Sequence, residues 1–352
     1  MRKVSIVGTV GVPACYGGFE TLVENLLDHN KADFLYIVYC SGKIYKKKLV
    51  TYKSAELRYI NLNANGWSSI FYDFIGMLRS LDTDTMLILG VSGSFFLPFI
   101  RYIYHGKIIT NIDGLEWKRD KWKKPIKYIL HLFEKIAVGY SDIIVGDNKE
   151  IIKYVKDYYK KKSELIEYGA NHAKNNYDPD LKDAYPFIET KYAVSICRIE
   201  PENNISIILK AFASQNNLAL VMIGNWTSSE YGRSLFIKYS HYKHIYLYEP
   251  EYDIDKINYI RCHAKLYIHG HSAGGTNPSL VEAMHLGLPI LAYDCAYNRA
   301  TTENSCLYWK DANELKSFIM TCRFENNGVS MKKIADRRYT WEIIAAKYEA
   351  LF

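Results

Sequence analysis

The sequence predicts an α/β protein of two domains, each a parallel sheet with helices on both faces. The chain has 352 residues, more than one hydrophobic core usually organises, and its hydrophobic content of 49% is ample for two cores. Short β-branched runs alternate with helical stretches, which is the pattern of right-handed βαβ units. A polar stretch at 171–191 interrupts this alternation, and a second series of strands follows it.

Six runs predict the strands of the first domain. They are Lys3–Val7, Phe34–Tyr39, Leu57–Ile60, Met86–Leu89, Lys107–Thr110 and Ile143–Val145. After the first run, apolar residues recur at helical spacing from Phe19 to Leu27, so this helix should face the sheet with one apolar stripe.

Five further runs predict the second domain. They are Tyr192–Ile196, Leu218–Ile223, Ile245–Tyr248, Leu266–Ile268 and Ile290–Tyr293. A last helix is expected at Thr340–Leu351, and such a tail can pack back on the first domain. We therefore expect an N-terminal domain at 1–172, a C-terminal domain at 173–338 and a terminal helix within 339–352.

Composition narrows the class of protein. Seven cysteines without a Cys-x-x-Cys pair fit neither a disulfide framework nor a zinc site. There is no signal-peptide pattern and no run of about 18 apolar residues, so we expect a cytoplasmic protein. The formal charge of +7 suits phosphate-bearing ligands or an anionic membrane, although solubility alone would also explain it.

A glycine-rich loop lies between the first strand and the first helix, at 8–20. Its glycines let backbone amides approach a phosphate or a sugar, and we single out Gly17, Gly18 and Glu20 as acceptor-side or phosphate-binding residues. The dinucleotide fingerprint is missing, because Gly8 and Gly11 have the wrong spacing and no acidic residue ends the second strand. A nicotinamide enzyme is disfavoured, and a purely structural turn remains the alternative.

The segment 267–284 carries the strongest functional pattern, a strand, a loop of small residues and a helix. Free amides at Gly274, Gly275 and Thr276 precede the helix start and could hold a diphosphate. Glu282 lies about one turn into the helix, where a carboxylate could accept the two hydroxyls of a ribose. His269 and His271 fit hydrogen bonding or packing better than metal binding.

Four segments together resemble the bacterial rhamnosyltransferases of capsule and cell-wall polysaccharide synthesis, which are retaining glycosyltransferases with the GT-B fold. They are 8–21, the Asp-Gly-Leu-Glu-Trp-Lys-Arg run at 113–119, 198–204 and 269–284. The resemblance implies two facing Rossmann-like domains with a cleft between them, the donor held mostly by the C-terminal domain and the acceptor mostly by the N-terminal one.

The resemblance also implies site residues. Arg198 corresponds to the diphosphate-binding arginine and Glu282 to the second glutamate of the family's Glu-x7-Glu motif. The donor-binding set is then Arg198, Gly274, Gly275, Thr276, Asn277 and Glu282. Two positions depart from the pattern, because the first glutamate would fall at Gly274 and the usual lysine at Asn203.

Asp113 follows the fifth predicted strand, so its carboxylate should lie at the carboxyl edge of the sheet. We expect Asp113 and Arg198 to be catalytic, Asp113 as a base toward the acceptor hydroxyl or as an orienting group for the sugar. A turn or helix-capping aspartate is the alternative. Glu116 is a weaker second candidate.

Three Asp-x-Asp matches, at 82–84, 178–180 and 253–255, lie where aspartate is ordinary, so no essential metal or other cofactor is expected. The Lys/Arg/Trp-rich segment 117–128 has a composition suited to the interface of an anionic membrane, with a solvated basic face as the alternative. No nucleic-acid partner is expected.

These observations predict a glycosyltransferase on the inner face of the plasma membrane. It would move a sugar, L-rhamnose from dTDP-β-L-rhamnose first, to a lipid-diphosphate-linked glycan with retention of configuration. A UDP-hexose or UDP-N-acetylhexosamine donor is the main alternative. A nucleotide-sugar epimerase or a non-catalytic assembly partner would fit the same two-domain pattern.

Overall fold

The computed structural model describes residues 1–15, 17–32, 34–119, 122–175, 181, 185–321, 324 and 327–352. The chain divides into two compact units. Unit 1 contains Met1–Gly169 and Trp341–Phe352, and unit 2 contains Ala170–Thr340. The expected linker residues 176–180 and 182–184, which include the Asp178-x-Asp180 match, lie outside the described residues, as do Asp120 and Lys121 of the basic segment.

Unit 1 is built on an eight-stranded sheet in the order β3-β4-β2-β1-β5-β6-β7-β8. The strands are β1 (Lys3–Val7), β2 (Leu35–Ser41), β3 (Thr51–Tyr52), β4 (Ala55–Ile60), β5 (Thr85–Leu89), β6 (Lys107–Asn111), β7 (Ile143–Gly146) and β8 (Glu164–Leu165). All neighbouring strands pair in parallel except β3 and β4. The carboxyl ends of the parallel strands therefore share one edge, where ligands bind in open α/β sheets.

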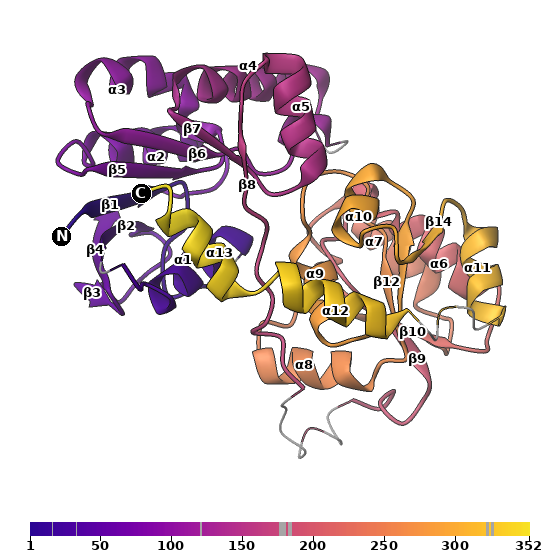
Figure 1. Cartoon of the computed structure of the whole chain (residues 1–352). Helices are drawn as coiled ribbons and strands as arrows, with labels where there is room; N and C mark the ends of the chain where they lie inside the picture. Colours follow the sequence, from indigo (N-terminus) through magenta and orange to yellow (C-terminus); the bar gives the residue numbers. More distant parts are fainter. Residues whose placement is uncertain are drawn as a thin grey trace. The chain divides into compact units, whose positions relative to one another are not determined.

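The helices of unit 1 cover both faces of this sheet. They are α1 (Gly18–Asp28), α2 (Ser68–Leu78), α3 (Leu97–Ile103), α4 (Lys124–Tyr140), α5 (Lys149–Tyr159) and α13 (Trp341–Glu349), with short 3-10 helices η1 (Ser92–Phe96) and η2 (Glu116–Lys118). Figure 1 shows α3 and α4 on one side of the sheet and α1 with α13 on the other. The last helix of the chain thus belongs to the same unit as the first strand.

Helix α13 completes the hydrophobic core of unit 1. Its buried side chains Trp341, Ile344 and Tyr348 pack in one cluster with α1 and with strands β1 and β2. The approach is close at Gly169, where an added Cβ would lie 2.5 Å from the Trp341 ring. Only glycine leaves room for the indole at this point.

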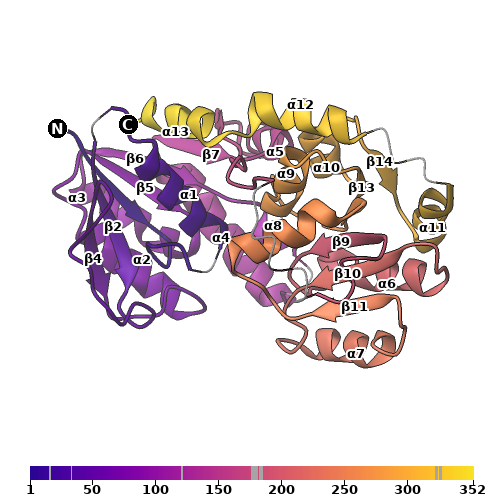
Figure 2. The same ribbon diagram turned by 90° about the horizontal axis from the view of Figure 1, so that it is seen from below.

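Unit 2 is built on a six-stranded, wholly parallel sheet in the order β11-β10-β9-β12-β13-β14. The strands are β9 (Tyr192–Ile196), β10 (Ala219–Ile223), β11 (Ile245–Tyr248), β12 (Leu266–His269), β13 (Ile290–Tyr293) and β14 (Leu307–Trp309). Figure 2 shows β9, β10 and β11 side by side. The order turns outward in both directions from β9 and β12, so a topological switch point lies between these two strands.

Side chains cap three of the helices of unit 2. They are α6 (Ile205–Ala213), α7 (Glu230–Tyr239), α8 (Ile254–His263), α9 (Pro278–His285), α10 (Ala296–Thr301), α11 (Ala312–Thr321) and α12 (Gly328–Arg338), with the 3-10 helix η4 (Pro201–Asn203). Ser229, Asp253 and Asn277 accept backbone N–H hydrogen bonds at the starts of α7, α8 and α9. Asp253 of the third Asp-x-Asp match is therefore a helix cap.

The packing of α13 leads to a prediction about stability. Trp341 is 1% exposed and Trp67, in the same unit, is 67% exposed. Replacing Trp341 by alanine should lower the free energy of unfolding by about 3–5 kcal/mol, because it leaves a cavity in the core. Urea denaturation followed by circular dichroism measures this, with Trp67→Ala as the control expected to change the value by no more than about 0.5 kcal/mol. Equal effects of the two substitutions would contradict the role of α13.

Candidate functional site

Three loops meet at the carboxyl edge of the unit 2 sheet, and hydrogen bonds tie them together. The loop after β9 and the loop after β12 are joined twice at Ser272, whose N–H and hydroxyl both donate to the Glu202 carbonyl at 2.9 Å. Asn204 Nδ2 donates to the Gly270 carbonyl at 2.8 Å. Asn298, in α10 after β13, donates to the His271 carbonyl at 2.8 Å. The three strand ends therefore form one framework.

Asn203 occupies the centre of this framework. Its Nδ2 donates to the Arg198 carbonyl at 2.7 Å, so its Oδ1 faces His271 and can only accept. His271 Nδ1 therefore carries the hydrogen of the 2.7 Å contact with Asn203 Oδ1. Both side chains are buried. The amide thus links the two loops and also holds the backbone at Arg198.

The side chain of Arg198 stands free of this framework. It is 56% exposed, and its Nε lies 3.7 Å from Glu200 Oε2. A guanidinium at this strand end is available to an anion approaching the edge of the sheet, because its backbone is fixed while its head remains in solvent.

The β12–α9 loop, which is hydrogen-bonded to the loop that carries Arg198, provides backbone amides. Gly274 has a φ of 106°, a conformation that L side chains rarely adopt, and Gly275 and Thr276 lead from it into α9. The Asn277 side chain accepts from the Ser279 N–H at 3.1 Å, so it caps the helix. The positive end of the helix dipole and the preceding amides favour a negatively charged group at this point.

Glu282 lies in α9 with both carboxylate oxygens engaged. Oε1 is 3.0 Å from His172 Nε2, and Oε2 forms an ion pair with the buried Arg261 of α8. Burial would raise the pKa of Glu282, but Arg261 and His172 outweigh burial and hold the pKa below its ordinary value. The carboxylate is therefore ionised, with one lone pair left on each oxygen for a further donor.

His269, at the end of β12, is a neutral and buried side chain. Burial lowers the pKa of His269 to about 3, and its Nε2 has no hydrogen-bond partner among the described residues. Its ring stacks with that of Tyr267, with centroids 6.0 Å apart. It packs behind the loop, as expected from the sequence.

In unit 1, the glycine-rich loop after β1 is held by its own carboxylate. Glu20 is buried, and its Oε1 accepts from the Thr9 hydroxyl at 2.8 Å and from the Val10 N–H at 2.7 Å. Gly17 precedes α1 and Gly18 is its first residue. The loop thus presents the backbone at Gly17 and Gly18, whereas Glu20 works inside the loop.

Asp113 follows β6 in a left-handed conformation, with φ of 58°. Its N–H donates to Asn111 Oδ1 at 2.9 Å, and Asn111 Nδ2 donates in turn to the Tyr348 hydroxyl of α13 at 2.7 Å. Within the described part of the chain, no hydrogen bond or ion pair engages the Asp113 carboxylate. The side chain is therefore free at the carboxyl edge of its sheet, where the sequence placed it.

Glu116 and the tryptophans that follow Asp113 are engaged within unit 1. Glu116 pairs with Arg119 at 2.8 Å and accepts from Trp122 Nε1 at 3.0 Å. Trp117 Nε1 donates to the buried Glu134 at 3.1 Å. Glu116 is thus a structural carboxylate, and the two indole N–H groups of segment 117–128 point at protein partners.

Two family models match separate segments of the chain. Residues 1–171 match a family described as a domain of unknown function, DUF1972, and residues 178–305 match glycosyl transferases group 1. No curated protein gives a significant match.

Solved structures match along the whole chain. A sucrose-phosphate synthase from Thermosynechococcus elongatus has a TM-score of 0.81 at 14% identity, covering 100% of this chain and 98% of the other. Anabaena HepE in complex with UDP-glucose has a TM-score of 0.77 at 12% identity, covering 100% and 99%. An E. coli trehalose-6-phosphate structure bound with UDP-2-fluoro glucose has a TM-score of 0.73 at 12% identity, covering 99% and 98%. The chain has the GT-B fold.

Residues 178–305 match the model of glycosyl transferases group 1, and the prediction of the fold class is confirmed. Sequence reasoning did not find Arg261 and His172, which fix Glu282, or the link between Asn203 and His271. Arg261 belongs to an ordinary polar helix, and only its contact across to α9 distinguishes it. Its role has no sequence signal.

Within the residues that the structure describes, no group of three His, Cys, Asp or Glu side chains could hold a metal ion. No helix of the described chain is long and apolar enough to cross a membrane.

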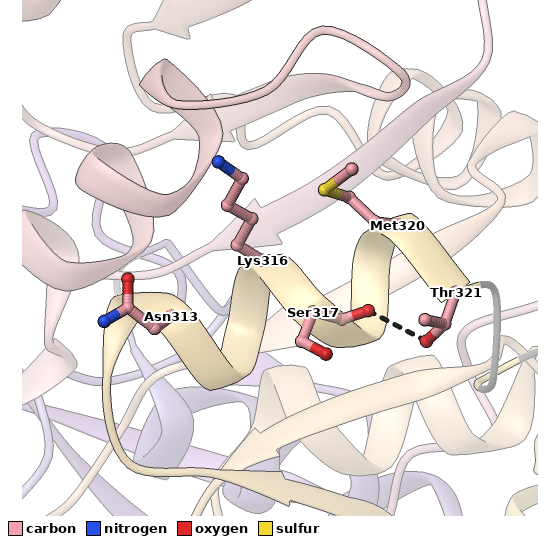
Figure 3. Close-up of a pocket in the computed structure, with 5 residues that line it drawn as sticks. All are labelled: Asn313, Lys316, Ser317, Met320 and Thr321. Atoms are coloured by element: carbon pink, nitrogen blue, oxygen red, sulfur yellow. Dashed lines mark hydrogen bonds between the residues drawn. The ribbon is translucent and has the colours of Figure 1, made fainter.

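A separate hollow, drawn in Figure 3, is lined by Asn313, Lys316, Ser317, Met320 and Thr321. All five residues belong to the single helix α11, and the hydrogen bond drawn is that of the Thr321 hydroxyl to the Ser317 carbonyl at 2.8 Å. None is an expected site residue, so we assign no ligand to it.

The pairing of Glu282 predicts a pH-dependent stability. Glu282→Gln should lower the free energy of unfolding by about 3 kcal/mol at neutral pH, because it leaves the buried Arg261 without a counter-charge. Since the folded pKa is lowered, the contribution is full above the ordinary carboxyl pKa and is lost as the pH falls through the folded value. The gap between the two proteins should therefore narrow in acid.

Urea titrations at a series of pH values measure this gap, with the exposed Glu230→Gln as the matched control. A gap of the same size at every pH would show that the amide acts by changing packing and not charge.

Proposed function

We propose that this chain transfers a sugar from a nucleoside diphosphate donor, a UDP-hexose in preference to dTDP-rhamnose, to a hydroxyl of a lipid-linked glycan. The GT-B fold and the group 1 domain support glycosyl transfer. The observation that carries the proposal is the β12–α9 loop, with Gly274 to Thr276 before a helix start and the exposed Arg198 on the loop joined to it.

Two observations bear on the identity of the donor, and they favour different nucleotide sugars. The resemblance of the motifs to rhamnosyltransferases favours dTDP-rhamnose. Structures with the same fold are described with UDP-glucose for Anabaena HepE and with UDP-2-fluoro glucose for the E. coli protein. We give the bound ligands more weight, because they are described in structures that match this chain along its whole length.

The donor-side residues Arg198, Gly274 to Thr276 and Glu282 have roles in the proposed reaction. Arg198 and the amides from Gly274 to Thr276 stabilise negative charge on the leaving diphosphate, the electrostatic contribution that usually dominates such catalysis. Glu282, fixed by Arg261 and His172, accepts ribose hydroxyls on its remaining lone pairs. With Gly274 at the position of the family's first glutamate, no carboxylate nucleophile is available there, so the proposed retention of configuration requires the acceptor to attack from the same face as the departing phosphate.

Asp113 and the backbone at Gly17 and Gly18 serve the acceptor side. The Asp113 carboxylate, which has no hydrogen-bond partner among the described residues, can accept the proton of an attacking hydroxyl, or hold the sugar by hydrogen bonds. A lipid-linked acceptor would place the reaction at the cytoplasmic surface of a membrane, in the synthesis of a surface polysaccharide. The basic segment 117–128 supports this through its lysines.

Nucleotide binding gives the first test. UDP should raise the melting temperature of the wild type more than dTDP or GDP does, because a ligand that binds only the folded state stabilises it. Arg198→Ala should weaken UDP binding by about tenfold or more, since a charge-assisted hydrogen bond is lost. The control is Arg233→Ala, another exposed arginine of unit 2.

Selective stabilisation by dTDP would instead support dTDP-rhamnose as the donor. Equal UDP binding by wild type and Arg198→Ala would overturn the assignment of Arg198. Conversion of the donor without any acceptor would instead indicate an epimerase.

Asp113→Asn should lower kcat by about 100-fold or more while leaving the KM for the donor unchanged, because the general base is removed and the donor site is not. Asparagine tolerates the left-handed backbone at this position, so the fold should be kept. Steady-state transfer to an acceptor measures both constants, with Glu116→Gln as the control carboxylate. Unchanged transfer by the asparagine variant would leave Asp113 as a turn residue.

A further inference from the structure

One face of unit 1 exposes a group of large apolar side chains, most of them aromatic. The exposed residues are Trp67, Phe71, Phe95, Phe99, Tyr102, Tyr128, Ile129 and Leu132. They lie on or beside α2, η1, α3 and α4, four elements that pack together. We call this set the aromatic face. Figure 1 shows α3 and α4 side by side along one side of the unit.

Ring contacts link the part of the aromatic face on α2 and η1 to α4. Phe96 lies between Phe71 of α2 and Phe95 of η1, with ring centroids 6.3 and 5.2 Å away, and Phe95 is 6.0 Å from Phe133 of α4. Phe74 stacks on Phe96 at 4.0 Å. Contiguous apolar patches of this kind on a soluble protein mark interaction sites, whereas single exposed hydrophobic residues are ordinary.

The exposed stripe of α4 combines apolar and basic residues. Lys124, Tyr128, Leu132 and Lys135 follow one another at intervals of four, four and three, so they share one side of the helix, and all four are exposed. Tyr128 is 81% exposed, and Tyr102 of α3 is 84% exposed. Aromatic rings with lysines beside them are typical of protein surfaces at the boundary between lipid headgroups and acyl chains.

The same elements expose no carboxylate. Residues 68–78, 92–103 and 124–140 contain two acidic side chains, Asp73 and Glu134, and both are buried. Burial raises the pKa of Asp73 to about 7, and Glu134 accepts hydrogen bonds from Trp117, Tyr154 and Tyr159. The charges that this face presents to solvent are therefore positive.

We propose that the aromatic face docks on an anionic lipid bilayer, with its rings in the interface and its lysines on the headgroups. The surface shares the exposed Lys123, Lys124 and Tyr128 with segment 117–128, which composition predicted. The two tryptophans of that segment do not take part, because the indole N–H groups of Trp117 and Trp122 are directed to Glu134 and Glu116. The inference rests on the proposed lipid-linked acceptor for its purpose, and bilayer binding is measurable without any sugar transfer.

Co-sedimentation of the full chain with lipid vesicles tests the inference. The wild type should bind phosphatidylcholine vesicles that contain phosphatidylglycerol, should bind pure phosphatidylcholine much more weakly, and should be released by salt. Two triple variants, Phe99→Ser with Tyr102→Ser and Tyr128→Ser, and Lys123→Glu with Lys124→Glu and Lys135→Glu, should each bind at least about tenfold more weakly.

Control variants distinguish binding through the aromatic face from nonspecific hydrophobic or electrostatic binding to vesicles. Ile237→Ser with Tyr252→Ser removes two exposed apolar groups from unit 2, and Lys43→Glu with Lys46→Glu and Lys47→Glu reverses three charges elsewhere in unit 1. Both controls should bind vesicles like the wild type. UDP should stabilise all of these proteins equally, so failure to bind lipid and failure to bind nucleotide are separate results.

Three outcomes would overturn the docking proposal. One is equal binding to neutral and anionic vesicles, and another is loss of binding in the controls as large as in the variants. The third is self-association of the wild type, measured by sedimentation, that the aromatic variant abolishes while no vesicle binding is seen.

Discussion

The hydrogen bond from His271 Nδ1 to Asn203 Oδ1 is the interaction on which the site in unit 2 depends. It joins the ends of β9 and β12 at the switch point of the sheet, and the same asparagine holds the carbonyl of Arg198. The backbones are so close that a Cβ on Gly270 would lie 2.1 Å from the Asn203 carbonyl. An asparagine in the position of the lysine that the family resemblance predicts therefore replaces a mobile charge by a neutral, rigid link. The positive charge for a bound diphosphate would then come from Arg198, whose side chain is exposed.

Most of the fold could be predicted from the sequence, for a physical reason that particular strands illustrate. The runs at Lys3–Val7, Tyr192–Ile196 and Ile290–Tyr293 coincide with β1, β9 and β13, because inner strands that are covered on both faces need mostly apolar runs. The strands that sequence reasoning missed, β3, β8 and β14, are short and lie at the edges of their sheets. An edge strand of two or three residues has too little burial to leave a pattern.

Only part of the candidate site could be predicted from the sequence. Glycine-rich loops and the arginine after β9 carry local signals, since a helix start and a strand end are encoded within a few residues. The roles of Glu20, Glu134 and Glu282 depend on partners 10 to 110 positions away in the chain. No spacing rule distinguishes a carboxylate that clamps its own loop, as Glu20 does, from one that faces a ligand. Such roles emerge only when tertiary contacts assign each acceptor its donors.

The attachment of α13 to unit 1 has a consequence for biosynthesis. Arg2 donates to the Phe352 carbonyl and Lys107 to that of Leu351, so the two extremities of the chain close the same core while all of unit 2 is inserted between them. A ribosome makes the chain from the N-terminus, and domains generally fold as units during synthesis. Unit 2 is contiguous and can fold as soon as it emerges, whereas unit 1, although begun first, must wait for the last helix. Of the two units, unit 1 is thus begun before unit 2 and completed after it, and the part of its core that α13 covers stays open while unit 2 is made.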